Sequence, residues 1–178
     1  MLRTGERVEV KSWMHRCGAA VAAVAAAAVL SSVAPSPVAA IPQTSACATD
    51  PCDDFDYSNQ DLRKEFFTKG SLKRANFSNS NLERVTLFGA NLEKANFTGA
   101  NLLYADLGQC NMQGANLTDA ILEGVIVSST NFDGAIIEGS DWTDVIIRKD
   151  INNELCKVAS GTNPVTEVET RESLMCLD

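Results

Sequence analysis

The sequence predicts an all-β solenoid in which the chain completes one square coil every twenty residues. A large apolar residue returns at every fifth position from Leu62 to Ile147, without a miss, over eighteen repeats. A small residue stands two positions before most of these, and Asn, Asp, Ser or Thr often stands directly before them. A strand has a period of two and a helix has one of about 3.6, so a strict period of five fits neither. A fixed repeat of this kind is typical of a solenoid.

Each repeat supplies one large and one small inward residue, so the chain can turn a corner at every fifth residue and close a coil after four repeats. Residues twenty apart then stack at the strand spacing of about 4.8 Å, and eighteen repeats make about 4.5 coils over roughly 22 Å. On one outer face, Asn76, Asn96 and Asn116 are expected to form an amide ladder. One column inside the rod is expected to consist of Leu62, Leu82, Leu102, Leu122 and Trp142.

Six glycines stand two positions after a large apolar residue, where a turn can require a positive φ angle. Glycine adopts a positive φ without strain because it has no Cβ atom. These glycines are Gly89, Gly99, Gly114, Gly124, Gly134 and Gly139. Their spacing indicates that a tight turn follows each large inward residue.

The repeats ANFSN, ANLEK, ANFTG, ANLLY, ADLGQ and ANLTD resemble those of the pentapeptide-repeat proteins, and the resemblance covers residues 60–149. It implies that the predicted rod is a right-handed quadrilateral β-helix. A leucine-rich or helical solenoid would need a repeat of about 20–29 residues or more, with a different internal pattern. The repeat region is therefore assigned to the five-residue class.

Residues 1–40 are predicted to be a cleaved targeting segment. Lys11 and Arg16 precede the apolar run GAAVAAVAAAAVLSSV, and small residues lead up to Ala40. This order is typical of an export signal. The alternative is a membrane anchor, but the run is short and consists mostly of Ala. Glu6 and Glu9 depart from a chloroplast transit segment, which is normally poor in acids.

The two ends of a stacked coil leave backbone groups and apolar side chains uncovered, so both ends are expected to be capped. Residues 41–59 are predicted as the N-terminal cap, with Phe55 and Tyr57 facing the first coil. Residues 150–178 are predicted as a short helical C-terminal cap. The stretch NNELCKVAS before Gly161 predicts one helix, and a second helix could begin at Thr166 or at Thr170.

Five cysteines lie outside the targeting segment. Cys156 and Cys176 flank the predicted tail helices and would form a disulfide in an oxidising compartment. Closing a loop of about twenty residues is worth around 3 kcal/mol on the chain-entropy model. Cys47 and Cys52 bracket a predicted turn and could form a second bridge. Cys110 occupies a small inward position and is expected to be a buried, unreactive thiol.

The tail LCKVASGTNPVT…TRESLMC, following a rod and an export signal, resembles the small thylakoid-lumenal pentapeptide-repeat proteins of plants and algae, the lumenal 15 kDa type. The resemblance implies a soluble protein of the chloroplast thylakoid lumen with a disulfide-linked helical C-terminal cap and no established catalytic site. The periplasm or another exported compartment is the alternative. In the endoplasmic reticulum the sequons at Asn76, Asn96 and Asn116 would accept glycans, which would crowd one another on successive coils.

The outward positions of the rod are charged unequally along its axis. Between Gln60 and Tyr104 there are seven bases and four acids, whereas between Ala105 and Ile147 there are seven acids and no base. This asymmetry indicates either ordinary solubility or an oriented docking surface, where the electrostatic field steers a partner.

Some outward positions are apolar, and exposed apolar patches mark contacts. Phe88, Leu103 and Tyr104 are predicted as a partner surface. The chain's own tail is expected to fold back over the outward isoleucines. These are Ile121, Ile126, Ile136 and Ile146.

The composition argues against catalysis. The only histidine, His15, lies in the targeting segment, so the mature chain cannot use Ser-His, Cys-His or His-metal chemistry. No catalytic residue, cofactor-binding residue, metal ligand or cofactor is predicted, and the net charge of −8 argues against a nucleic-acid partner. No membrane span is expected in the mature chain, and no oligomeric state is predicted.

The function predicted is a non-catalytic protein-protein interaction or scaffold module of the thylakoid lumen, with an unknown lumenal protein as partner. The alternative is a redox-responsive lumenal protein, in which reduction of Cys156–Cys176 loosens the C-terminal cap. A DNA mimic that inhibits a topoisomerase is less favoured, because the first half of the rod is basic and the chain carries an export signal.

Overall fold

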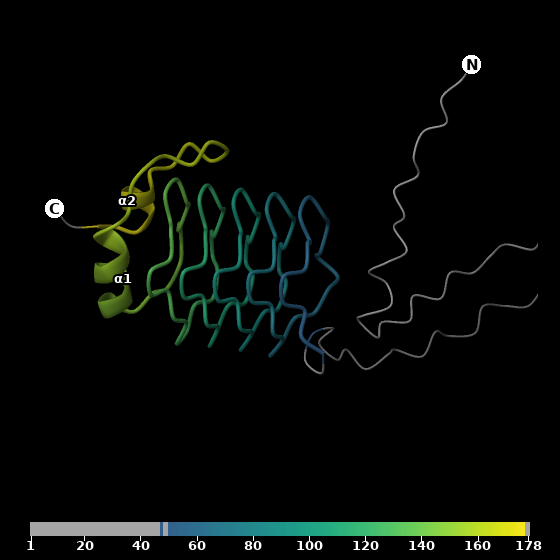
Figure 1. The fold of residues 1–178 in the computed structure, drawn as a ribbon. Helices are drawn as coiled ribbons and strands as arrows, with labels where there is room; N and C mark the ends of the chain where they lie inside the picture. Colours follow the sequence, from purple (N-terminus) through teal and green to yellow (C-terminus); the bar gives the residue numbers. More distant parts are fainter. Residues whose placement is uncertain (1–46, 48–49, 177–178) are drawn as a thin grey trace, which may run out of the picture.

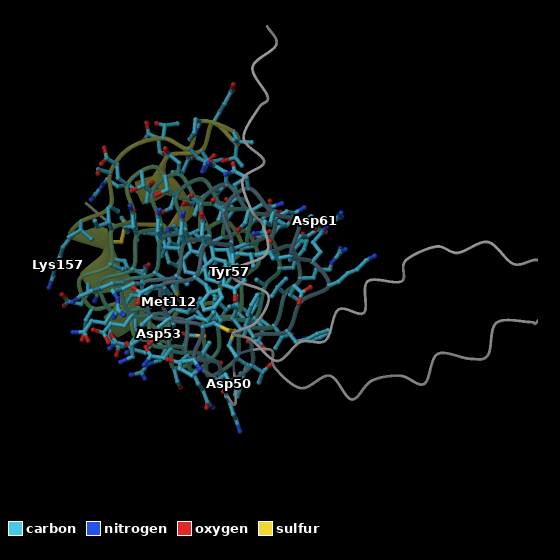
Figure 2. The ribbon with its side chains drawn as sticks, turned by 45° about the vertical axis from the view of Figure 1, so that its right-hand side comes forward. Asp50, Asp53, Tyr57, Asp61, Met112 and Lys157 are labelled. Atoms are coloured by element: carbon cyan, nitrogen blue, oxygen red, sulfur yellow. A yellow bond between two sulfur atoms is a disulfide. The ribbon has the colours of Figure 1, made fainter. Side chains whose placement is uncertain are left out.

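The structure, a computed structural model, describes Cys47 and residues 50–176, and the predicted targeting segment 1–40 lies outside these residues. The chain forms a rod of stacked coils, with the first coils at one end and two helices at the other (Figure 1). Side chains fill the inside of the rod. Met112 is fully buried within it and Tyr57 packs against its core, whereas Asp61 and Lys157 lie at the outside of the molecule (Figure 2).

Parallel bridges, fifteen of them within the described residues, join each coil to the next at a register of twenty residues. At each bridge one backbone amide donates to the following coil, as Leu82 N does to Asn101 O at 2.7 Å. Another donates to the preceding coil, as Asn101 N does to Ser80 O at 2.9 Å. Each bridge is one residue long, because the chain turns again before a longer strand can form. The register is the one that the repeat predicts, and it places residues twenty apart on the same face.

Each corner is a tight turn, and from Cys52 to Asp144 the residue two places after the large one has a positive φ angle at every corner except that of Lys64. Ala95 N donates to Leu92 O at 3.0 Å and closes one such turn, with Lys94 at a φ of 58°. The six glycines predicted at this position all have positive φ angles. Bulkier residues adopt the same conformation at other corners: Lys69, Arg74, Asn79, Arg84, Lys94, Tyr104, Gln109, Asp119, Ser129 and Asp144. Positive φ is therefore a property of the corner, and a residue with a Cβ atom is strained there.

Aromatic rings fill the core near the first coils and again near the last. The rings of Tyr57 and Phe77 stack at 5.0 Å, and those of Phe77 and Phe97 stack at 4.9 Å with their planes 7° apart. These distances match the coil spacing of about 4.8 Å, so the twenty-residue register itself produces the stack. At the other end the ring of Trp142 meets Phe132 edge-on at 5.4 Å.

The repeat region was predicted to start at residue 60. The coil geometry already begins at Cys52. Cys52 N donates to Ser71 O at 2.8 Å, and Tyr57 N donates to Asn76 O at 2.7 Å. Cys52 and Tyr57 occupy large inward positions five residues apart, which continues the period toward the N-terminus. Phe55 and Tyr57 pack against the core, as the prediction of an inward-facing pair requires.

Two helices follow the last coil. α1 spans Lys149–Cys156 and α2 spans Thr170–Ser173. The sequence predicted the first helix over residues 152–160, but the observed helix starts earlier because the chain leaves the last coil at Arg148, whose extended backbone forms the N-cap. α2 begins at Thr170, one of the two starts that the sequence left open. Neither helix in the described part of the chain is long and apolar enough to cross a membrane.

The C-terminal segment occupies backbone groups at the open edge of the last coil. Ser160 O accepts a hydrogen bond from Gly139 N at 2.8 Å, and Ser173 Oγ accepts one from Trp142 N at 3.0 Å. In the preceding coil the amide equivalent to that of Gly139 belongs to Asp119, and it donates to Glu138 O in the next coil at 2.9 Å. The segment therefore substitutes for a further coil at these two positions, where unpaired amides would otherwise form an exposed sheet edge.

Asn163 fastens this segment to the rod. Its side chain is buried, and its Nδ2 amide lies within hydrogen-bonding distance of the carbonyl oxygens of Asp119, Ala120 and Gly139, at 3.2, 3.3 and 2.9 Å. Its Oδ1 accepts from Val165 N at 2.9 Å. One side chain thus joins the tail to two successive coils, and the segment between α1 and α2 extends back along the rod from its end (Figure 1).

Candidate functional site

Three of the four faces of the rod carry asparagine ladders. Asn96 Nδ2 donates to Asn76 Oδ1 at 3.1 Å, which confirms the predicted amide ladder for the pair Asn76 and Asn96. The other two faces have the same arrangement, with Asn101 bonded to Asn81 and Asn111 bonded to Asn91, each at 3.4 Å. The asparagines also accept backbone amides two residues further on, as Asn96 does from Thr98 N. They therefore stabilise turns and adjacent coils.

The fourth face has no asparagine at the corresponding positions. We call it the 66–146 face, and it comprises a central column and the two columns of turn residues beside it. The central column is Phe66, Thr86, Asp106, Ile126 and Ile146, joined by parallel bridges. One flank contains residues 63–64, 83–84, 103–104, 123–124 and 143–144, and the other contains residues 68–69, 88–89, 108–109 and 128–129.

The structure places all three predicted partner residues on the 66–146 face. Phe88 lies on one flank, and Leu103 and Tyr104 lie on the other, one coil further along. Phe88 and Leu103 are half-buried, whereas Tyr104 is 48% exposed. Residues that are 15 and 16 apart in the sequence thus share one face, because their two columns are the corners at its two edges.

Tyr104 is held between the coils above and below it. The Arg84 guanidinium lies 5.7 Å from the centroid of the tyrosine ring, and the hydroxyl donates to Glu123 Oε1 at 3.4 Å. On its other side the ring covers Gly124 so closely that a Cβ atom there would overlap it. The ring is therefore a fixed feature of the surface.

The prediction that the tail covers the outward isoleucines is wrong for Ile126, Ile136 and Ile146. Their side chains are 54%, 51% and 94% exposed. The tail is held elsewhere, because Asn163 binds the corner at Asp119 and Gly139, which does not border the 66–146 face. Ile126 and Ile146 therefore extend the apolar surface that Phe88, Leu103 and Tyr104 begin.

Sequence reasoning did not assign Ile126 and Ile146 to a partner surface, although a usable signal was present. When the outward positions are sorted by twenty, only the column through residue 106 lacks the asparagines of the other three. A polar ladder stabilises neighbouring coils, so a column that lacks asparagine throughout and ends in two isoleucines indicates a different use for that face.

The 66–146 face is also charged unequally along the axis. In its first two coils four bases, Arg63, Lys64, Lys69 and Arg84, accompany one acid, Glu83. Further along, its charged residues are acids alone: Asp106, Glu123 and Asp144. Arg63 and Arg84 pair with Asp61 and Glu83 at 2.6 and 3.1 Å.

Lys64 and Lys69 are exposed and have no ion pair within the described part of the chain. Because exposed ion pairs contribute little to stability, the bases on this face are available to a partner at small cost.

The hydrogen bonds from Arg63 hold the pKa of Asp61 down at about 2, so that carboxylate stays charged at every physiological pH.

The structure joins Cys47 to Cys52 and Cys156 to Cys176 by disulfide bonds. Cys47 and Cys52 are buried, whereas Cys156 and Cys176 are half-buried at the end of the rod. Cys110 is a free, buried thiol. Burial raises the pKa of Cys110 to about 12, and Sγ donates to Leu87 O at 3.0 Å. This thiol has little nucleophilic character because the thiolate is the reactive form.

No group of three or more His, Cys, Asp or Glu within residues 50–176 is arranged to hold a metal ion.

Comparison with known proteins agrees with this geometry. The family model for pentapeptide repeats matches in eight copies over residues 71–102 and 101–139. A solved pentapeptide repeat protein from the Arabidopsis thaliana thylakoid lumen is 38% identical, with a TM-score of 0.70, and the alignment covers 71% of this chain and 88% of that chain. No curated protein sequence matches the chain.

Two cyanobacterial pentapeptide repeat structures match at lower identity. The protein from Cyanothece 51142 is 23% identical over 55% of this chain and 88% of its own, with a TM-score of 0.25. HetL from Nostoc sp. strain PCC 7120 is 19% identical over 48% of this chain and 50% of its own, with a TM-score of 0.22.

The fold is the right-handed quadrilateral β-helix. The chain belongs to the pentapeptide-repeat family.

Proposed function

We propose that the protein is a non-catalytic interaction or scaffold module of the thylakoid lumen, and that it binds another protein through the 66–146 face. One observation carries this proposal. Three faces have asparagine ladders and carry at most one outward isoleucine each, whereas the fourth has no ladder and presents both Ile126 and Ile146 to solvent. Exposed apolar side chains gathered on one face are typical of a contact surface.

The location rests on two supports. The solved protein that is 38% identical comes from the thylakoid lumen of Arabidopsis thaliana, and residues 1–40 have the composition of an export signal. The periplasm or another exported compartment is the alternative. Mass spectrometry of the washed lumen of isolated thylakoids tests the first location, because the mature chain with its N-terminus directly after Ala40 is expected there.

We also propose that the rod has about 4.5 coils and that residues 150–178 act as its C-terminal cap. The hydrogen bonds from Gly139 N and Trp142 N to the tail support the capping role. A chain that ends at Arg148 is then expected to associate end to end through the open edge. Sedimentation velocity measures this, and a truncated chain that stays monomeric and stable would refute the cap.

Photo-crosslinking in intact chloroplasts tests the interaction. A benzoylphenylalanine at position 126 is expected to give a defined crosslinked product whose yield saturates with light dose. The matched control carries the same group at position 136, which has nearly the same exposure, 51% against 54%, but lies on a ladder face. Mass spectrometry identifies the partner. Equal products from both positions, or none from position 126, would exclude binding through this face.

A second candidate function is a redox response through Cys156–Cys176. The observation in its favour is that this disulfide is half-buried at the rod end, whereas Cys47–Cys52 is buried. Dithiothreitol would reduce the bond to two thiols and itself become a cyclic disulfide. Reduction is expected to lower the Tm of the wild type, and to leave that of a Cys156→Ser/Cys176→Ser variant unchanged. A wild-type Tm that does not move would remove this candidate.

A DNA-mimic inhibitor is favoured least, because four bases interrupt the acidic surface of the 66–146 face. A supercoiling assay that shows topoisomerase inhibition at low protein concentration would revive it.

A further inference from the structure

We propose that the segment bound by the 66–146 face is a short amphipathic α-helix of another protein, which lies along the rod axis with an acidic N-terminal end and a basic C-terminal end. This inference rests on the proposed interaction function and specifies the partner's chemistry. Its supports are the dimensions of the face, the spacing of its apolar side chains, its charge gradient and the position of the chain's own tail.

The dimensions of the face suit a helix. Its central column has five rungs, from Phe66 to Ile146, and four intervals of about 4.8 Å make it roughly 19 Å long. About three extended residues separate successive corners, which makes the face roughly 10 Å wide. A helix with its side chains is about 10–12 Å across, and about thirteen residues span 19 Å at 1.5 Å per residue. One helix of three to four turns therefore covers the face.

The apolar side chains of the face recur once in each coil. They are Phe66, Phe88, Leu103 with Tyr104, Ile126 and Ile146. Their repeat along the axis is the coil spacing of about 4.8 Å, which is close to the helical pitch of about 5.4 Å. Apolar residues at i, i+3, i+4 and i+7 of a partner helix would therefore meet one apolar side chain in almost every turn.

The charge gradient gives the direction of the helix. Lys64 and Lys69, which have no ion pair in the described part of the chain, stand at the beginning of the face, and Glu123 and Asp144 stand toward its end. Acidic residues of a partner are therefore expected beside the early coils and basic residues beside the later ones. Acids at the N-terminus and bases at the C-terminus of a helix also complement its macrodipole, so the partner helix runs in the same direction as the rod.

The chain's own tail leaves this face free. The tail is fastened by Asn163 to the corner at Asp119 and Gly139, and Ile126 and Ile146 stay 54% and 94% exposed. A helix of this length buries less surface than a standard interface of about 800 Å² per partner, so a reversible contact is expected.

A selection experiment tests the inference. The full chain is the bait for a phage library of 16-residue peptides, and the Ile126→Asn/Ile146→Asn variant is the counter-selection bait. Asparagine occupies the equivalent outward position at Asn81, Asn96 and Asn131 on the other faces, so the variant keeps a side chain that suits the fold. The peptides enriched on the wild type are expected to be amphipathic, with acids in the first third and bases in the last third. Circular dichroism is expected to show that they become helical on binding.

Binding of one enriched synthetic peptide is then compared across variants. Ile126→Asn is expected to weaken binding at least tenfold, and Ile136→Asn, the same change on a ladder face, less than twofold. Lys64→Glu/Lys69→Glu is expected to weaken binding at least tenfold, and a peptide with bases in place of its N-terminal acids is expected to restore it. Lys94→Glu, the same charge change on another corner, is the control and is expected to leave binding unchanged.

Four results would overturn the inference: enriched peptides that bind as extended chains, peptides with the opposite charge order, equal loss in the Ile126→Asn and Ile136→Asn variants, and no enrichment over the counter-selection bait. Sedimentation of the full chain provides a further test, because a dimer that Ile126→Asn dissociates would make a second copy the occupant. If the peptide selection overturns the helix while crosslinking at position 126 still gives a defined product, the face binds a protein of another shape. If the crosslinking gives no product either, the proposed function is refuted as well.

Discussion

The side-chain Nδ2 of Asn163 lies 2.9 Å from the carbonyl oxygen of Gly139. This contact, with those to Asp119 and Ala120, connects the C-terminal segment to two successive coils through one buried amide. The position of the tail depends on it.

Replacement of this amide is expected to loosen the tail. Asn163→Ala removes both the donors to the rod and the acceptor for Val165 N, and buried groups left without a partner cost about 1–3 kcal/mol. The free energy of unfolding, measured with urea, is expected to fall by about that amount. Asn153→Ala changes an exposed asparagine of α1 and is the control. An equal loss in both variants would contradict the role given to Asn163.

The corner glycines provide a paired test of strain. Gly124 and Gly134 have nearly equal φ angles of 63° and 66°, but a Cβ atom at Gly124 would overlap the Tyr104 ring, whereas one at Gly134 would meet nothing within 4 Å. Gly134→Ala is expected to cost about 1–2 kcal/mol from the left-handed backbone alone. Gly124→Ala is expected to cost more.

The difference between these two variants should disappear when Tyr104→Ser accompanies Gly124→Ala, because the overlapping ring is then absent. Thermal unfolding measures all three. If Gly124→Ala and Gly134→Ala have the same Tm, the ring of Tyr104 is not held against Gly124.

The aromatic stack is expected to determine the stability of the first coils. Phe97 is completely buried and stacks on Phe77 at 4.9 Å, so Phe97→Ala is expected to cost about 3–5 kcal/mol through the cavity it leaves. Phe97→Leu is expected to cost clearly less, since leucine fills the equivalent inward position at Leu92. Urea denaturation measures both variants. Equal losses would show that the cost comes from the lost aromatic ring and not from the cavity.

Cys110 is expected to remain a thiol in the folded protein. Burial raises its pKa from 9.0 to about 12, so the folded state keeps a proton that the unfolded state loses above pH 9. The stabilisation is fully present below pH 9 and is lost as the pH rises toward 12. Iodoacetamide at pH 8, followed by peptide mapping, is expected to label Cys110 only after unfolding. Against Cys110→Ser, wild-type stability is expected to decline more steeply above pH 9. Labelling in the native state would show that the site opens.

The interior of the rod was predictable from the sequence because its rule is local. The positions of Leu82, Phe97 and Gly124 follow from a period of five, and the columns follow from four repeats to a coil. The start of the coils was placed too late because Cys52 and Tyr57 were not counted among the large inward residues, although both occupy those positions.

The path of the tail could not be read in the same way. Asn163 precedes Pro164 in a stretch that reads as an ordinary turn, and its three carbonyl partners lie on coils 24 to 44 residues earlier. No local pattern shows which corner of the rod the amide will meet. The coverage of Ile126 and Ile146 was mispredicted for this reason, while Phe88, Leu103 and Tyr104 were assigned correctly to outward positions because the repeat alone determines direction.

The twenty-residue register described by the parallel bridges has a consequence for how such a surface changes through insertion and deletion. Loss of twenty residues removes one coil and shortens the row of apolar side chains without bending it. Loss of five residues rotates everything after the deletion by a quarter turn. Ile126 and Ile146 would then stand on the side of an asparagine ladder, and a partner that spans the rod would lose half of its contacts although every inward residue still packs.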